Sequence, residues 1–189
     1  MLRAESAVLS PRRAWRPKRL PVDYLRHEGV SAAWHGSSDR GTVLVLAAQL
    51  ETLVDAAVRK SLAGRHRQGR HPLLDGPLAP VGTWFSKNLL LFHSGVISER
   101  LWRDVERVRE IRDRFAQDWS CDSFEDPKIH TQLVSFNSFS SPAVAGNESD
   151  ADRSAFIAAV ISLMKAMDEV CKRTRARQPK ADEQVYREG

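Results

Sequence analysis

One stretch of the chain decides the fold, residues 73–126, which read LLDGPLAPVGTWFSKNLLLFHSGVISERLWRDVERVREIRDRFAQDWSCDSFED. A Gly-Pro turn at Gly76 keeps its start irregular, and Gly95 separates two segments with helical spacing. After Ser98, which is a good N-cap, apolar residues recur every three or four positions over 101–115. The stretch therefore predicts a short helix before Gly95 and a longer amphipathic helix after Ser98.

Helical spacing is also found before this stretch. Residues 39–62 read DRGTVLVLAAQLETLVDAAVRKSL, with apolar residues on a 3.6-residue repeat, which predicts a helix. Ser38 or Asp39 is its candidate N-cap, and Gly64 is its candidate terminator. Residues 21–35 have weaker helical spacing, and they predict one more short helix.

The C-terminal part of the chain has the same character. Asp126 places an N-cap oxygen before Pro127, which predicts a short helix from that point. Residues 137–150 are rich in Ser, Gly and Pro and predict a loop, and from Asp150 a last helix is expected to run to about Arg175. Because no alternating run is bounded by turns, strands are not expected. The sequence thus predicts an all-α fold, a single helical bundle of five or six helices.

The composition is that of a soluble globular protein. The chain has 189 residues, of which 28% are charged and 42% hydrophobic, enough for one domain with a stable core. Cys121 and Cys171 lie far apart without metal-ligand spacing, which indicates free thiols in a reducing cytoplasm. We find no long apolar run and no secretion signal, so we expect a cytoplasmic protein without a membrane segment. The Arg-rich start also fits an organellar transit peptide.

The net charge of +5 belongs to the two ends of the chain, and the part between them is mildly acidic. We therefore expect a basic disordered tail over 1–19, a helical domain over 20–174, and a polar tail over 175–189. A basic tail with an indole can bind nucleic acid or an acidic protein, or serve solubility alone. The candidate contact residues of the first tail are Arg12, Arg13, Trp15 and Arg16.

An ordered set of motifs resembles the mannitol operon repressor family, a group of small all-helical bacterial proteins. The resemblance covers roughly residues 38–172. The motifs that carry it are Asp75-Gly76-Pro77-Leu78, Trp84-Phe85-Ser86-Lys87, Gly95-Val96-Ile97-Ser98, Ile111-Arg112-Asp113-Arg114-Phe115-Ala116 and Phe124-Glu125-Asp126-Pro127. The resemblance implies a transcription repressor without enzymatic activity. Since we find no helix-turn-helix pattern, we expect it to act through a regulatory protein partner, or through DNA held by its tails.

The end of the long predicted helix also resembles the motif of HEPN-type helical ribonucleases. That motif is an arginine and a polar residue, then a histidine after three further residues, and this chain has Arg112, Asp113 and Gln117 at these positions. Glutamine has no titratable nitrogen and cannot act as a general acid or base. The alternative function is thus an RNA-associated HEPN-like domain that is catalytically inactive because Gln117 replaces the histidine.

Three arginines of the same helix, Arg109, Arg112 and Arg114, are candidates for contact with a phosphate or a partner. Acidic residues alternate with them, which is typical of an ion-paired helix face. Arg112 lies beside the apolar stripe, so we expect it to be half-buried and paired with a carboxylate. The candidate carboxylates are those of Asp113, Asp118, Asp122 and Asp126.

No catalytic motif, cofactor fingerprint or metal-ligand set is recognisable, so we expect no enzyme activity, no cofactor and no metal. A third hypothesis is a plain interaction module, monomeric or homodimeric, that presents an exposed apolar residue such as Trp84 or Trp102.

Overall fold

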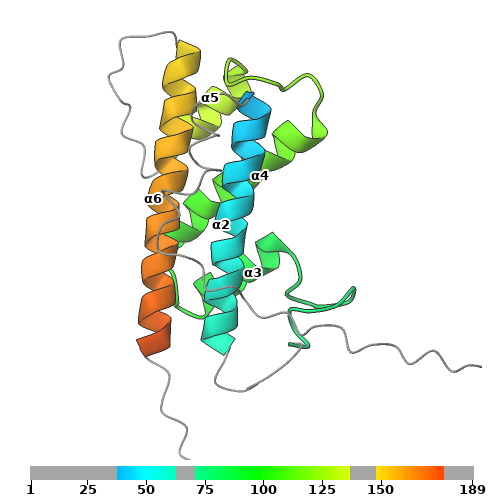
Figure 1. The fold of residues 1–189 in the computed structure, drawn as a ribbon, viewed down its shortest axis with the longest axis vertical. Helices are drawn as coiled ribbons and strands as arrows, with labels where there is room; N and C mark the ends of the chain where they lie inside the picture. Colours follow the sequence, from blue (N-terminus) through cyan, green and yellow to red (C-terminus); the bar gives the residue numbers. More distant parts are fainter. Residues whose placement is uncertain (1–37, 63–70, 137–147, 177–189) are drawn as a thin grey trace, which may run out of the picture.

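The computed structural model describes residues 38–62, 71–136 and 148–176, and these form five helices and no strand (Figure 1). This confirms the predicted all-α bundle. The helices are α2 (Asp39–Leu62), α3 (Trp84–His93), α4 (Glu99–Gln117), α5 (Pro127–Val134) and α6 (Glu148–Ala176).

The two longest helices, α2 and α6, lie side by side and run in the same direction (Figure 1). Arg153 near the start of α6 bonds to Asp39 in the first turn of α2, and Cys171 near the end of α6 approaches the Leu53 carbonyl. Helix α4 packs across both, α3 packs against α2 and α4, and α5 packs against α4 and α6. The last helix that the structure describes, α6, therefore packs beside the first one, α2.

The core forms along the apolar stripe of α4, whose Val105, Val108, Ile111 and Phe115 are fully buried. An aromatic chain continues from there, since Phe124 has its ring centroid 5.5 Å from that of Phe115 and 5.5 Å from that of Phe156. This chain joins α4, the loop after it and α6 into one core.

Local sequence determines where the helices begin. The Ser38 hydroxyl accepts a hydrogen bond from Gly41 N at 3.2 Å, and the Ser98 hydroxyl accepts one from Leu101 N at 3.3 Å. Asp126 accepts from Lys128 N at 2.8 Å, with Pro127 in the first turn where its missing N–H is harmless. Gly95 has φ of 66°, a left-handed conformation that favours glycine. The predicted caps Ser38, Ser98 and Asp126 are thereby confirmed.

The last helix begins at Glu148, two residues before the predicted Asp150. Other predictions lie outside the described residues: the tail over 1–19, the short helix over 21–35, the terminator Gly64 and most of the loop over 137–150. Most of the tail over 175–189 is also outside, so the tail boundaries stay predictions.

Helix α2 is long and apolar enough to cross a membrane by length and composition alone, with a hydropathy of 1.5 over an 18-residue window. Half of that window is buried inside the bundle, as is usual for the central helix of a globular core. Its Val43, Leu46, Leu50 and Val54 are fully buried against the other helices. The apolar character of α2 is accounted for by this packing.

Candidate functional site

The polar face of α4 turns toward α3 in its middle part, and there the arginines are engaged in ion pairs. Arg109 donates from Nε to Glu106 Oε2 at 2.8 Å and from Nη1 to Asp113 Oδ2 at 2.8 Å. Burial lowers the pKa of Arg109, but the hydrogen bond and charge of Glu106, with further help from Asp113, outweigh it and raise the pKa. Glu106 also accepts from Asn88 of α3 at 2.7 Å. Arg109 therefore ties α4 together and is not free to bind a ligand.

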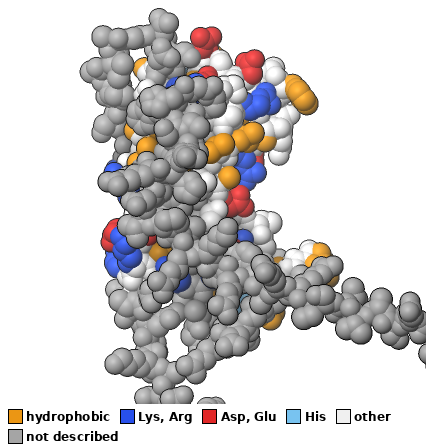
Figure 2. All heavy atoms as spheres, in the orientation of Figure 1, with side chains coloured by type: hydrophobic (Ala, Val, Ile, Leu, Met, Phe, Trp, Pro, Cys, Tyr) orange, Lys and Arg blue, Asp and Glu red, His pale blue; other side chains and the backbone are white. Residues whose placement is uncertain are grey.

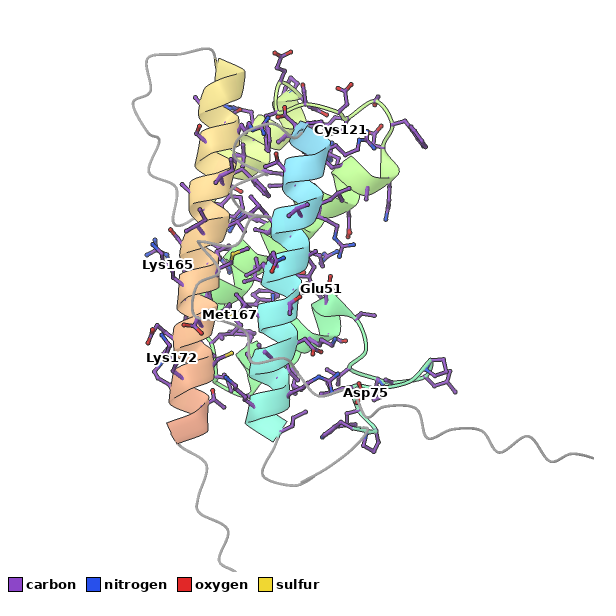
Figure 3. All side chains as sticks on the ribbon, in the orientation of Figure 1. Glu51, Asp75, Cys121, Lys165, Met167 and Lys172 are labelled. Carbon is purple, nitrogen blue, oxygen red and sulfur yellow. The ribbon has the colours of Figure 1, made fainter. Side chains whose placement is uncertain are left out.

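Arg112 lies one turn further along α4, and its guanidinium is also engaged in contacts within the protein. Its Nη1 lies 3.1 Å from Asp113 Oδ1, its Nη2 lies 4.0 Å from Glu51 of α2, and its guanidinium lies 5.2 Å from the ring centroid of Trp84. Figure 3 shows Glu51 about halfway along α2. The expected carboxylate partner Asp113 is thus found, together with Glu51, which the sequence did not suggest. Two other carboxylates predicted as partners of Arg112 have different partners: Asp118 accepts hydrogen bonds from Ser120, and Asp126 caps α5.

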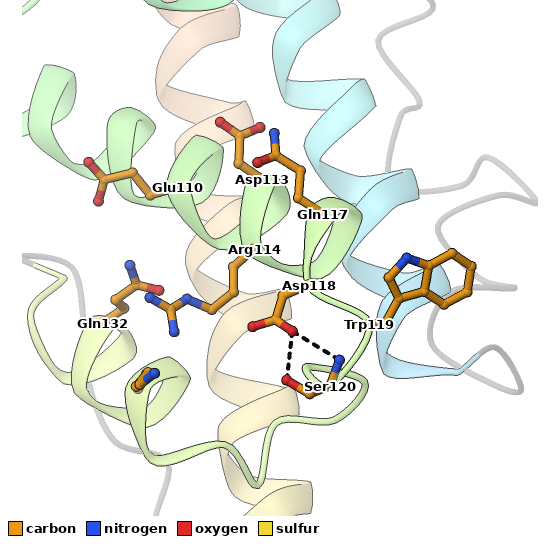
Figure 4. Close-up of a pocket in the computed structure, with 9 residues that line it drawn as sticks. Glu110, Asp113, Arg114, Gln117, Asp118, Trp119, Ser120 and Gln132 are labelled. Atoms are coloured by element: carbon orange, nitrogen blue, oxygen red, sulfur yellow. Dashed lines mark hydrogen bonds between the residues drawn. The ribbon is translucent and has the colours of Figure 1, made fainter.

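Arg114 lies elsewhere, beside an open hollow of about 840 Å³ at the C-terminal end of α4 (Figure 4). Gln117 lines the same hollow, whereas Arg109 and Arg112 do not. The structure therefore separates the three candidate arginines. The complete lining comprises Glu110, Asp113, Arg114, Gln117, Asp118, Trp119, Ser120, Lys128 and Gln132.

A tight turn over 118–121 forms one rim of the hollow. Asp118 Oδ1 accepts from Ser120 N at 2.9 Å and from Ser120 Oγ at 2.6 Å (Figure 4). The hydrogen bond from the Ser120 hydroxyl, then that from its backbone N–H, lower the pKa of Asp118 below its ordinary value of 3.8. Asp118 is therefore a carboxylate at neutral pH, and the turn is held from within.

Arg40 of α2 holds the same turn from outside. Its Nη2 donates to the carbonyl oxygens of Asp118 at 3.2 Å and Cys121 at 3.0 Å, and it also approaches that of Trp119 at 3.5 Å. An arginine at these carbonyls also complements the negative C-terminal end of α4. The side chain of Trp119 projects from this fixed backbone and is 90% exposed, with the Arg40 guanidinium 5.9 Å from its ring centroid.

Two cations line the hollow without an ion pair to any described residue, Arg114 of α4 and Lys128 of α5. In Figure 4 the guanidinium of Arg114 extends toward Gln132. Gln132 Oε1 is buried and accepts no hydrogen bond from the described part of the chain. The hollow thus combines two cations without a direct ion pair, three carboxylates, two amides and an exposed indole, a set that suits recognition of another molecule.

The prediction that Trp84 or Trp102 is an exposed interaction residue is wrong. Trp84 is only 3% exposed, because it begins α3 on the face that packs into the core with Leu91. Trp102 is half-buried and stacks on Phe92, with ring centroids 5.1 Å apart. Among the described residues, the exposed tryptophan is Trp119, which was not predicted from the sequence. Its position in a polar Asp-Trp-Ser turn between two helices was the available signal.

Among the described residues, no group of three or more His, Cys, Asp or Glu side chains is arranged to hold a metal ion. Cys121 and Cys171 are both free and buried, and burial raises the pKa of each thiol. Both are therefore protonated and weakly nucleophilic at neutral pH. The tail candidates Arg12, Arg13, Trp15 and Arg16 lie outside the described residues.

The fold defines a class, the small all-α bundles in which two long parallel helices are crossed by a third. The chain is similar to a chain in the X-ray structure of the MtlR–HPr complex from Escherichia coli, with a TM-score of 0.55 and 18% sequence identity. The likeness covers 74% of this chain and 96% of the other. At this identity it shows the fold alone. No protein-family model and no curated protein matches the sequence.

Proposed function

We propose that the protein is a non-enzymatic regulator that acts by binding another protein. The observation that carries the proposal is the fold shared with almost the whole of a chain taken from a complex of two proteins, MtlR and HPr. The motifs within residues 73–126 that resemble the mannitol operon repressor family support it independently. The regulated process is then transcription, in the cytoplasm, with repression as the direction of control.

The arrangement of the ionisable groups favours binding over catalysis. Arg112 and Asp113, which occupy the motif positions of HEPN-type ribonucleases, bond to each other at 3.1 Å. Gln117 takes the place of the general base, and it lies in a hollow that Arg112 does not line. The contact between Arg112 and Asp113 and the separate position of Gln117 therefore favour a structural role for Arg112 over a catalytic one.

An affinity pull-down with the full-length chain tests the proposal, with and without nuclease and with and without residues 1–19. We expect one protein to be retained in stoichiometric amount after nuclease treatment and after removal of the tail. Retention of nucleic acid alone, lost when residues 1–19 are removed, would mean that the protein acts by direct nucleic-acid binding. Failure to retain any stoichiometric protein would also refute the proposal.

A further inference from the structure

Trp119 is held in an unusual position for so large an apolar side chain. It is 90% exposed, yet its backbone is fixed by Asp118, Ser120 and Arg40. An exposed side chain usually loses conformational freedom when it binds, and a backbone that is already ordered reduces this cost. Tryptophan is also among the residues that contribute most at protein interfaces. The turn thus presents a preorganised anchor.

The acidic side chains beside Trp119 already have partners within the protein, whereas two basic side chains have no direct ion pair. Asp113 is paired with Arg109 and Arg112, Asp118 accepts two bonds from Ser120, and Glu110 lies 4.0 Å from Arg109. Arg114 and Lys128, in contrast, have no ion pair with a described residue. The lining carries three carboxylates against these two cations, and Asp118 interacts electrostatically with both, but neither cation has a direct ion pair that would block a further carboxylate.

We propose that the surface formed by Trp119, Arg114 and Lys128 binds an acidic segment of a protein partner. A carboxylate of the segment lies between Arg114 and Lys128, where the amide of Gln132 adds a further polar contact. Trp119 inserts into an apolar recess of the same partner. This inference rests on the proposed function, and it adds the location and the chemistry of the contact.

A nucleic acid fits the surface less well than an acidic protein does. A nucleic-acid backbone carries closely spaced negative charges, and affinity depends on neutralising several of them. Here Glu110, Asp113 and Asp118 line the same hollow as the two cations, and Asp122 and Glu125 are exposed on the loop between α4 and α5. Figure 2 shows basic and acidic side chains intermixed on the visible described surface, without a single basic patch. A single carboxylate can avoid these acids, whereas a polyanion cannot.

The test uses the full-length chain and three labelled probes. The first is a short peptide with a single Glu among Leu and Ser residues, the second has Gln in place of that Glu, and the third is a single-stranded RNA of the same length. Fluorescence anisotropy measures the affinity of each. We expect the Glu peptide to bind about ten-fold more tightly than the Gln peptide, and to weaken as salt is added.

Two variants separate the contribution of the two cations from the contribution of Trp119. We expect the double substitution Arg114→Gln with Lys128→Gln to abolish the preference for the Glu peptide, and Trp119→Ala to weaken both peptides alike. The matched controls are Lys165→Gln, an exposed cation on α6 (Figure 3), and Leu78→Ala, whose side chain is 94% exposed. Both controls are expected to bind as the wild type does.

Equal binding of the two peptides, the absence of measurable peptide binding, or tighter binding of the RNA would each overturn the inference. The pull-down distinguishes this failure from failure of the proposed function. If the triple variant at positions 114, 119 and 128 retains the same protein partner as the wild type, the regulator binds its partner through another surface. If the wild type retains no partner, the proposed function itself is wrong.

Discussion

Arg153 Nη1 lies 2.9 Å from Asp39 Oδ1, and this ion pair joins α6 to the first turn of α2 across 114 residues of sequence. Nη2 of the same guanidinium donates to Thr42 Oγ1 at 2.9 Å, and the other oxygen of Asp39 accepts from Phe124 N at 3.0 Å. One carboxylate therefore holds together α2, α6 and the loop between α4 and α5.

We expect Arg153→Ala to lower the free energy of unfolding by about 2 kcal/mol, because both partners are mostly buried and Asp39 would lose its countercharge. Arg153→Lys should recover only part of this, since an ammonium lacks the planar fork that reaches Asp39 and Thr42 together. Urea denaturation followed by circular dichroism measures both changes.

The matched control for this prediction is Arg103→Ala. Arg103 pairs with Glu99 on the surface of α4, and both side chains are more than half exposed. Its loss should cost less than about 0.5 kcal/mol. Equal effects of the two substitutions would show that the link between α2 and α6 contributes little.

This link also marks a limit of what the sequence could predict. The five helices and three of their N-caps were predictable because periodicity and capping act over a few residues, as at Ser98 and Asp126. The pairing of Arg153 with Asp39 depends on how α2 and α6 pack, and no local pattern encodes that.

At the candidate site, too, helix periodicity predicted the surroundings of some residues but not of others. Arg112 was expected beside a carboxylate, because its position next to the apolar stripe of α4 is set by helix geometry. Burial of Trp84 depends on which face α3 packs into the core, and exposure of Trp119 depends on how the turn after α4 is held, so neither could be predicted from periodicity alone. Lys128 and Arg114 come from different helices, and only the fold brings them to one hollow.

Phe124 offers a second prediction, since its side chain is fully buried between Phe115 and Phe156. We expect Phe124→Ala to cost about 4 kcal/mol, from lost apolar burial and the cavity left behind. Phe85→Ala removes a ring of the same size that is 45% exposed, and should cost about 1 kcal/mol. Thermal unfolding of the two variants compares the costs, and a smaller loss at Phe124 than at Phe85 would contradict the described core.

The turn that carries Trp119 leads to a prediction about pH. Because Ser120 bonds to the charged form, the pKa of Asp118 in the folded protein lies below the ordinary 3.8. A lowered pKa means that the turn stabilises the fold above the ordinary pKa, and that this stabilisation is lost as the pH falls through the lowered value.

We expect an NMR titration of the Asp118 carboxyl to show this lowered pKa, and Ser120→Ala to raise it toward 3.8. Glu125→Gln, a nearby exposed substitution, is the control for general changes in charge. A pKa that Ser120→Ala leaves unchanged would show that the hydrogen bond from the Ser120 hydroxyl is not its cause.

The last prediction concerns the position where ribonucleases of the HEPN type have a histidine. We expect Gln117→His to give no RNA cleavage, because Arg112 is held by Asp113 and Trp84 and does not line the hollow in which residue 117 lies. Cleavage of a labelled RNA measures activity, with Gln117→Ala as the control for loss of the glutamine. Arg112→Ala should instead lower the free energy of unfolding by about 1 kcal/mol, through the lost ion pair and ring contact. If Gln117→His cleaves RNA and Arg112→Ala abolishes that cleavage, the two residues form a catalytic pair and the structural role assigned to Arg112 is incomplete.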